Sequence, residues 1–225
     1  MLETIGEILP LAVVIAISPI PIVATILMLL SPRARSTGIG FLVGWVVALL
    51  VQLAIFSALS NLLPGPSEDG SSPVSGALKI LIGVALVVLG IRKWTARPGE
   101  KDKDDAAEPA WMKRIDTLTG RGAIVFGMLL GANPKNILLA LAAGVTIGSS
   151  GLTLGEEIGS AAAFVGIAAI TVAVPVIVYL AAARHMQAPL IAVRTWLVAN
   201  NATVMSVQSL VIGVVVIGAG IGSFS

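Results

Sequence analysis

Six long apolar segments limit this chain to one kind of fold. A helix needs about 20 consecutive apolar residues to cross the hydrocarbon core of a bilayer, and lipid offers no partner for an open backbone hydrogen bond. Charged residues make up only 12% of the sequence, whereas a soluble domain has about 25%. We therefore predict an all-α integral membrane protein. Its predicted transmembrane helices cover residues 5–30, 37–62, 74–94, 121–147, 157–181 and 200–222.

The basic residues between these helices predict the orientation of the protein. Twelve of the fourteen Lys and Arg residues lie in segments 31–36, 92–121 and 182–199, whereas 63–73 and 148–156 hold none. Basic loops stay on the cytoplasmic side, so we expect a multi-pass protein of the cytoplasmic (inner) membrane with both termini outside. The connector 182–199 is only half apolar and is expected to lie on the membrane surface rather than to cross it.

The chain repeats its pattern of prolines and glycines at a shift of 115 residues. Each half has three predicted helices, an odd number, so the second half must be inverted relative to the first, as in many secondary transporters. We predict one three-helix repeat at 1–96, a charged cytoplasmic loop at 97–118 and a second repeat at 119–225. The repeated Gly-x-x-x-Gly pairs favour close helix packing, within one protomer or across a homodimer. The aligned positions are Pro19 with Pro134, Gly40 with Gly155, and Gly44 with Gly159.

Prolines fall near the middle of the first and fourth predicted helices. Each proline removes a backbone hydrogen bond and biases the residue before it away from helical geometry, so both helices should end and restart there. A restarted helix presents free N–H groups and a partial positive charge, and Lys135 adds an ammonium without a local acidic partner. The candidate substrate-binding residues are Ser18, Pro19, Pro21, Asn133, Pro134, Lys135 and Asn136.

This electropositive centre predicts a ligand with a phosphate, sulfate or carboxylate group, although Lys135 could instead carry a proton. The chain has no cysteine and one histidine, so we expect no metal site, no thiol chemistry and no cofactor. The predicted spans contain no paired acids and no nucleophile beside a base, so we expect no enzymatic activity. A nucleic-acid partner is not expected either, because the basic residues follow the membrane topology.

The stretches ISPIPIVATILMLLSPRARSTGIGFLVGW and GANPKNILLALAAG resemble the actinobacterial GAP family, the glycopeptidolipid- and sulfolipid-addressing proteins, within the LysE superfamily of small exporters. The resemblance covers essentially the whole chain. It implies a role in moving cell-envelope glycolipids to the surface, often alongside a larger lipid transporter. Ile20 stands where the amino-acid exporters of this superfamily have glycine, and the related thiol-electron carriers need cysteines that this chain lacks.

Three hypotheses follow for the function. The leading one is export of a lipid or amphiphile with an anionic headgroup, by alternating access around the site at Lys135. The second is an exporter of amino acids or other small solutes, which shares the Asn-Pro-Lys element. The third is a membrane scaffold that recruits a lipid exporter without transporting anything itself, for which loop 97–116 would matter and Lys135 would not.

Overall fold

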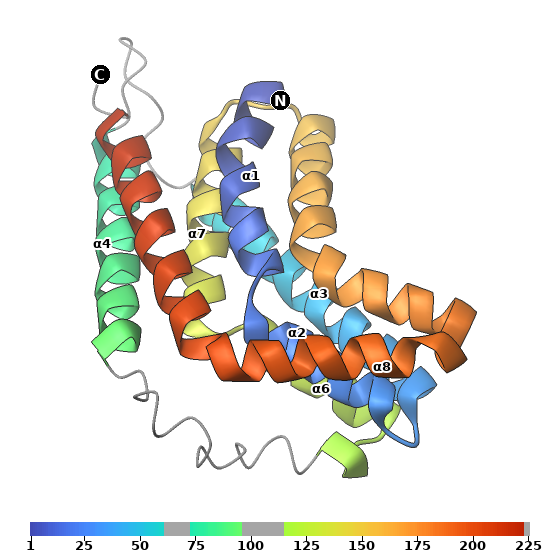
Figure 1. The fold of residues 1–225 in the computed structure, drawn as a ribbon. Coiled ribbons are helices and arrows are strands. Elements are labelled where there is room, and N and C mark those ends of the chain that lie inside the picture. The colour runs from blue at the N-terminus through green and yellow to red at the C-terminus, as the bar shows by residue number, and fades with distance from the viewer. Residues whose placement is uncertain (61–72, 96–114, 223–225) are drawn as a thin grey trace.

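The computed structural model describes residues 1–60, 73–95 and 115–222, and every regular element among them is a helix (Figure 1). Most of the predicted loop 63–73 and most of the predicted loop 97–118 lie outside these residues. The elements are α1 (Leu2–Ala16), α2 (Pro19–Leu30), α3 (Ala34–Ser60), α4 (Pro73–Thr95), the 3-10 helix η2 (Ile115–Thr117), α6 (Gly120–Gly131), α7 (Pro134–Ser149) and α8 (Leu154–Gly222).

Several of these helices are long and apolar enough to cross a membrane. Ala34–Ser60, Leu154–Ala183 and Thr203–Gly222 qualify singly, and up to five spans result if the bent pairs α1–α2 and α6–α7 each count as one. α4 covers the third predicted span but is not among these candidates, and three basic residues lie along it. The chain is therefore an all-helical membrane protein in the part that the structure describes, and a count of six spans stays a prediction.

The two proline sites break their helices where the sequence predicts. α1 and α2 meet at 51°, and α6 and α7 meet at 68°. Ser18 and Asn133 precede the prolines and have extended backbones, with ψ angles of 120° and 155°. Pro19 and Pro134 begin the helices that follow, where a missing N–H removes no helical hydrogen bond. We refer to Ile17–Ser18 together with the last turn of α1 as the first break, and to Ala132–Asn133 together with the last turn of α6 as the second break.

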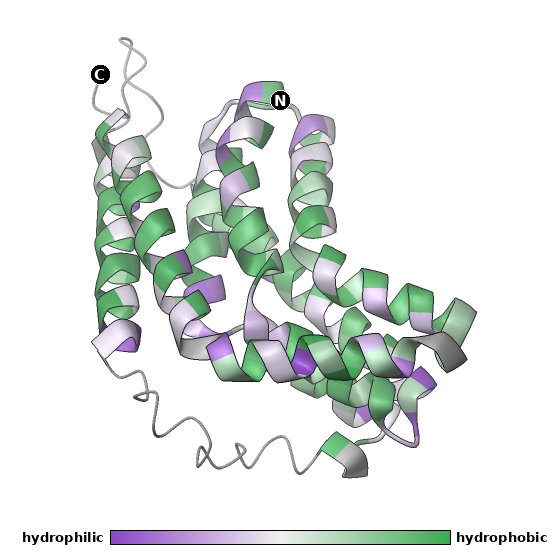
Figure 2. Ribbon diagram, in the orientation of Figure 1, coloured by the Kyte–Doolittle hydropathy of each residue, from purple (hydrophilic) through white to green (hydrophobic). Residues whose placement is uncertain are grey.

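The predicted connector 182–199 is helical and forms the middle of α8. At Ala182 the backbone is not helical (φ −143°, ψ 46°), and the candidate span that begins at Leu154 ends one residue later. Figure 1 shows α8 turning back on itself at this point, so that the connector runs across the bundle before the last part of α8 rises beside α4. Hydrophilic residues are frequent along the connector and at the ends of the upright helices (Figure 2). The connector is thus set apart from the spans by its direction and its composition.

The core lies around α3, which packs along α6 and α7 and also contacts α8. Trp45 and Phe41 of α3 are fully buried, as is Phe164 of α8. The rings of Phe41 and Trp45 are stacked with their centroids 6.2 Å apart. The ring of Phe41 also lies 6.2 Å from that of Phe126 in α6, and this packing holds α6 beside α3.

Glycines set the distance between α3 and α6. A Cβ atom at Gly40 or Gly44 would collide with a backbone carbonyl oxygen of α6. The second predicted pair behaves differently, because a Cβ at Gly155 would have no atom within 4 Å and one at Gly159 would meet only the sulfur of Met1 at 3.6 Å. Close helix packing within this chain is therefore found at Gly40 and Gly44 but not at Gly155 and Gly159.

A further glycine contact joins α4 to the last part of α8. A Cβ at Gly83 would lie 2.7 Å from the carbonyl oxygen of Gly213, and a Cβ at Gly213 would lie 2.8 Å from that of Gly83. No Gly-x-x-x-Gly spacing marks these two residues. The contact holds together two helices that stand at one side of the bundle in Figure 1.

We expect Gly44→Ala to lower the free energy of unfolding by about 1–3 kcal/mol, because the added methyl group would force α3 and α6 apart. Thermal unfolding of the purified protein in detergent measures the effect. Gly155→Ala is the matched control, since its Cβ enters open space and alanine favours a helix over glycine. Equal unfolding midpoints for the two variants would contradict the close approach at Gly44.

Candidate functional site

The ammonium of Lys135 lies where the two broken helices meet. The side chain is 5% exposed. Its Nζ donates hydrogen bonds to the carbonyl oxygen of Val14 at 3.3 Å, to Ser18 Oγ at 3.0 Å and to Gln208 Oε1 at 3.4 Å. All three acceptors are neutral, so no acidic side chain among the described residues forms a hydrogen bond with this charge. We call Lys135, Val14, Ser18 and Gln208 the lysine site.

The first break makes the carbonyl of Val14 available to Lys135. In an uninterrupted helix this oxygen would accept from the N–H of Ser18, four residues later. Here the Ser18 N–H donates to the carbonyl of Ile15 instead, at 3.2 Å. The end of α1 therefore carries free carbonyl oxygens and a partial negative charge, which favours an ammonium beside it.

Two more carbonyls of the first break are paired with side chains from far along the sequence. The Ile17 carbonyl would accept from residue 21, which is a proline without an N–H, and it accepts from Gln208 Nε2 at 2.7 Å instead. The Ala16 carbonyl accepts from the hydroxyl of Thr171. Because lipid supplies no donors, these contacts satisfy groups that would otherwise remain open. The first break is thus stabilised by the second half of the chain.

The second break is satisfied by neutral side chains. Asn133 Oδ1 accepts from the N–H of Asn136 at 3.1 Å, and this forms the helix cap that its position before Pro134 suggests. Its Nδ2 donates to the carbonyl of Leu130 at 2.6 Å. Gln52 of α3 donates from Nε2 to the carbonyl of Gly131 at 3.3 Å. No cation takes part in these three hydrogen bonds.

Ser18 holds the N-cap position of α2, directly before Pro19, but its side chain makes no capping hydrogen bond to the helix. The hydroxyl accepts from Lys135 and lies 3.7 Å from the sulfur of Met205, to which it donates. The local pattern of the two breaks is similar, but only Asn133 acts as a cap.

The structure brings the predicted site residues together to different degrees. Lys135 and Ser18 are in direct contact. Pro19, Pro21 and Pro134 contribute by ending helices and by leaving carbonyls open. Asn136 is fully buried, and neither polar atom of its side-chain amide has a hydrogen-bond partner in the part of the chain that the structure describes. A buried amide of this kind is rare in proteins and is available to a bound polar group.

Three residues of the two breaks were missed by the motif-based prediction: Gln208, Thr171 and Gln52. Each is a polar residue inside a predicted apolar span, which is itself a signal of function or of helix–helix contact. The prediction considered only the neighbours of the prolines. The missed residues lie far from the breaks in sequence, and Gln208 is 191 residues away from Ile17.

The fold and the site define a class of membrane protein in which two broken helices meet around a buried lysine. The family model described as Sap, sulfolipid-1-addressing protein, matches residues 8–222, and the chain belongs to this family. A search of curated proteins and a search of solved structures each found no match. Membership confirms the resemblance to the sulfolipid-addressing proteins and implies a role in sulfolipid addressing.

We expect Gln208→Leu to destabilise the protein by about 1–3 kcal/mol, because the Ile17 carbonyl would lose its donor and Lys135 would lose an acceptor. The midpoint of thermal unfolding in detergent measures the loss. Gln187→Leu, at an exposed position of the connector, makes the same chemical change and should alter stability by less than about 0.5 kcal/mol. An unchanged midpoint for Gln208→Leu would argue against this account of the first break.

Proposed function

We propose that this protein exports, or helps to export, cell-envelope lipids or amphiphiles whose headgroup is anionic. The name of the family refers to a sulfolipid, and a sulfated lipid carries an anionic oxygen group. The observation that carries the proposal is the Lys135 ammonium, which is 5% exposed and has only neutral hydrogen-bond partners among the described residues. We also propose that this fold is related to the LysE superfamily of small exporters.

The energetics of Lys135 favour an anionic ligand. A charged side chain in the middle of a bilayer costs about 2.5–3.5 kcal/mol on insertion scales, and it persists there mainly where it serves a function. Hydrogen bonds between an ammonium and an anionic oxygen are roughly twice as strong as those between neutral groups. An anionic headgroup would therefore replace one or more of the neutral oxygens around Lys135 with a gain in free energy. Ser18 and Asn136 would supply neutral hydrogen bonds to the same headgroup.

The pattern of cross-contacts supports an inverted repeat with alternating access. Ala16 and Gly131 correspond at the shift of 115 residues, and each carbonyl accepts from a side chain of the opposite half, Thr171 of α8 or Gln52 of α3. Each half thus stabilises the helix break of the other. Both breaks lie at the contact between the halves, so a rocking motion of one half against the other would open and close the site.

The positions of the chain ends support the proposed orientation. The N-terminus and the end of α8 lie at one end of the bundle, and the turn between α2 and α3 lies at the other (Figure 1). Arg33, Arg35 and Arg121 belong to this second end, which we place at the cytoplasmic face of the inner membrane. A larger lipid transporter is a proposed partner, and a homodimer is a proposed assembly.

We expect Lys135→Ala to reduce the sulfolipid at the cell surface about tenfold or more, because the anionic headgroup loses its charged partner. Surface lipid is extracted and measured by mass spectrometry in cells that depend on the variant, relative to the amount of inserted protein. Lys135→Arg, which keeps the charge in a wider group, should retain part of the activity.

Lys93→Ala is the matched control for this test, because it removes a lysine from an exposed position at the end of α4. It should export normally. Normal export by a stably inserted Lys135→Ala protein would remove Lys135 from the site and favour the scaffold hypothesis.

Deletion of residues 98–109 separates a transporter from a scaffold. We expect the deletion variant to keep most of its export activity, because the lysine site contains no residue of this segment. Loss of export with normal insertion would favour a scaffold that recruits another exporter. Uptake into everted vesicles that shows counterflow with amino acids, and not with lipids, would instead favour a small-solute exporter.

A further inference from the structure

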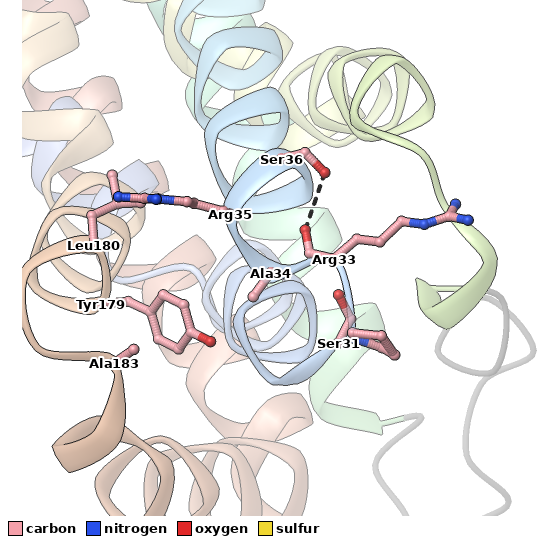
Figure 3. Close-up of a pocket in the computed structure, with 9 residues that line it drawn as sticks. Ser31, Arg33, Ala34, Arg35, Ser36, Tyr179, Leu180 and Ala183 are labelled. Atoms are coloured by element: carbon pink, nitrogen blue, oxygen red, sulfur yellow. Dashed lines mark hydrogen bonds between the residues drawn. The ribbon is translucent and has the colours of Figure 1, made fainter.

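A cavity of about 500 Å³ opens between the α2–α3 turn and α8 (Figure 3). One wall is formed by residues 31–36, and the other by Tyr179, Leu180 and Ala183 of α8. No residue of the lysine site lines it. The cavity lies at the end of the bundle where the basic loops are expected, beside the change in direction of α8 at Ala182.

The two arginines of the turn differ in where their side chains lie. Figure 3 shows Arg35 extending across the cavity toward Leu180, with the ring of Tyr179 beneath it. Arg33 extends in the opposite direction, away from α8. The backbone carbonyl of Arg33 accepts a hydrogen bond from Ser36 Oγ at 3.1 Å. Arg35 therefore supplies the guanidinium of this cavity, whereas the guanidinium of Arg33 points away from the cavity.

The guanidinium of Arg35 is available to a ligand. Its residue is exposed, and within the described ranges it makes no ion pair with an acidic side chain. A guanidinium presents its N–H groups in a planar fork that matches two oxygens of a phosphate or a sulfate. The hydroxyl of Tyr179 adds a donor on the opposite wall. The fork of Arg35 therefore suits a tetrahedral oxyanion.

The surface of α3 next to Arg35 suits the acyl chain of a lipid. Ile39, Val43 and Val47 follow Arg35 at steps of four residues, so each side chain lies beside the one before it along the helix surface. The three apolar side chains are exposed by 43%, 44% and 36%. This apolar stripe runs from the charged end of α3 toward its middle. A molecule with an oxyanion at one end and a hydrocarbon chain at the other matches both parts of the surface.

We propose that this cavity, the arginine cavity, binds the oxyanion headgroup of a membrane lipid from the cytoplasmic leaflet, with Arg35 as the charged ligand and the α3 stripe beneath the acyl chain. The cavity is the entry site from which the lipid moves to Lys135, and this role rests on the proposed export function. The binding itself does not depend on it. A phosphate and a sulfate headgroup present the same chemistry to Arg35.

The test is native mass spectrometry of the full chain in detergent. The probes are dioleoyl phosphatidylglycerol and a sulfated galactosylceramide, with dioleoyl phosphatidylcholine as the zwitterionic reference and inorganic phosphate as the free oxyanion. We expect the wild-type protein to bind both anionic lipids more tightly than the reference lipid. Arg35→Gln should weaken this binding about tenfold, since a charge-assisted hydrogen-bond pair is lost. Arg35→Lys should give an intermediate affinity, because it keeps the charge without the fork.

Arg33→Gln is the matched control, because it removes the same charge two residues away and should change the affinity by less than about twofold. Equal losses of lipid affinity for Arg33→Gln and Arg35→Gln would show that the lipids are attracted by the overall surface charge, and this result would overturn the proposal. Unchanged binding by folded Arg35→Gln protein would also overturn it, as would competition by inorganic phosphate at the affinity of the lipid. Lys135→Ala protein should still bind the lipids. If this variant binds them but does not export, lipid binding at the arginine cavity remains supported.

Discussion

The rest of this structure depends on how backbone carbonyls are satisfied where prolines interrupt a membrane helix. Prolines remove donors, and lipid supplies none in return. At the first break, three carbonyl oxygens are paired with the side chains of Lys135, Thr171 and Gln208, all of which lie in the second half of the chain. The break can therefore exist only in the folded protein, with its two halves in contact. The prolines create the open groups, and the packing of the halves determines which side chains reach them.

Both breaks leave backbone carbonyls without helical donors, but only the first break is paired with a charged side chain. Asn133 and Gln52 satisfy the second break with neutral amides. A neutral side chain could pair with the Val14 carbonyl as well, and it would avoid the cost of a buried ammonium. The structural role at the first break therefore does not require the positive charge of Lys135. This comparison within one molecule supports the view that the ammonium serves a ligand, and that its present acceptors hold it in place when no ligand is bound.

Local rules predicted the helix breaks well because proline acts on its nearest neighbours, whatever the fold. Ser18 and Asn133 both precede a proline, yet only Asn133 caps its helix, because Lys135 reaches the Ser18 hydroxyl from another helix. Gln208 was missed for a similar reason, since nothing near Ile17 in the sequence points to a partner 191 residues away. A Gly-x-x-x-Gly motif permits close packing but does not supply the neighbouring helix. The first such pair lies against α6, and the second faces open space or a methionine sulfur.

The first break and the arginine cavity are joined by one element, the first part of α8. Thr171 of this segment donates to the Ala16 carbonyl at the first break. Tyr179 of the same segment lines the arginine cavity, eight residues later, at a rise of about 12 Å along the helix. The segment ends at Ala182, where the backbone leaves helical geometry and the chain turns into the connector. A shift of this segment about that bend would change the width of the cavity and the hydrogen bond at the break together. Coupling between two sites needs an element that contacts both and can take two positions, and this part of α8 meets the first condition and has a bend that allows the second.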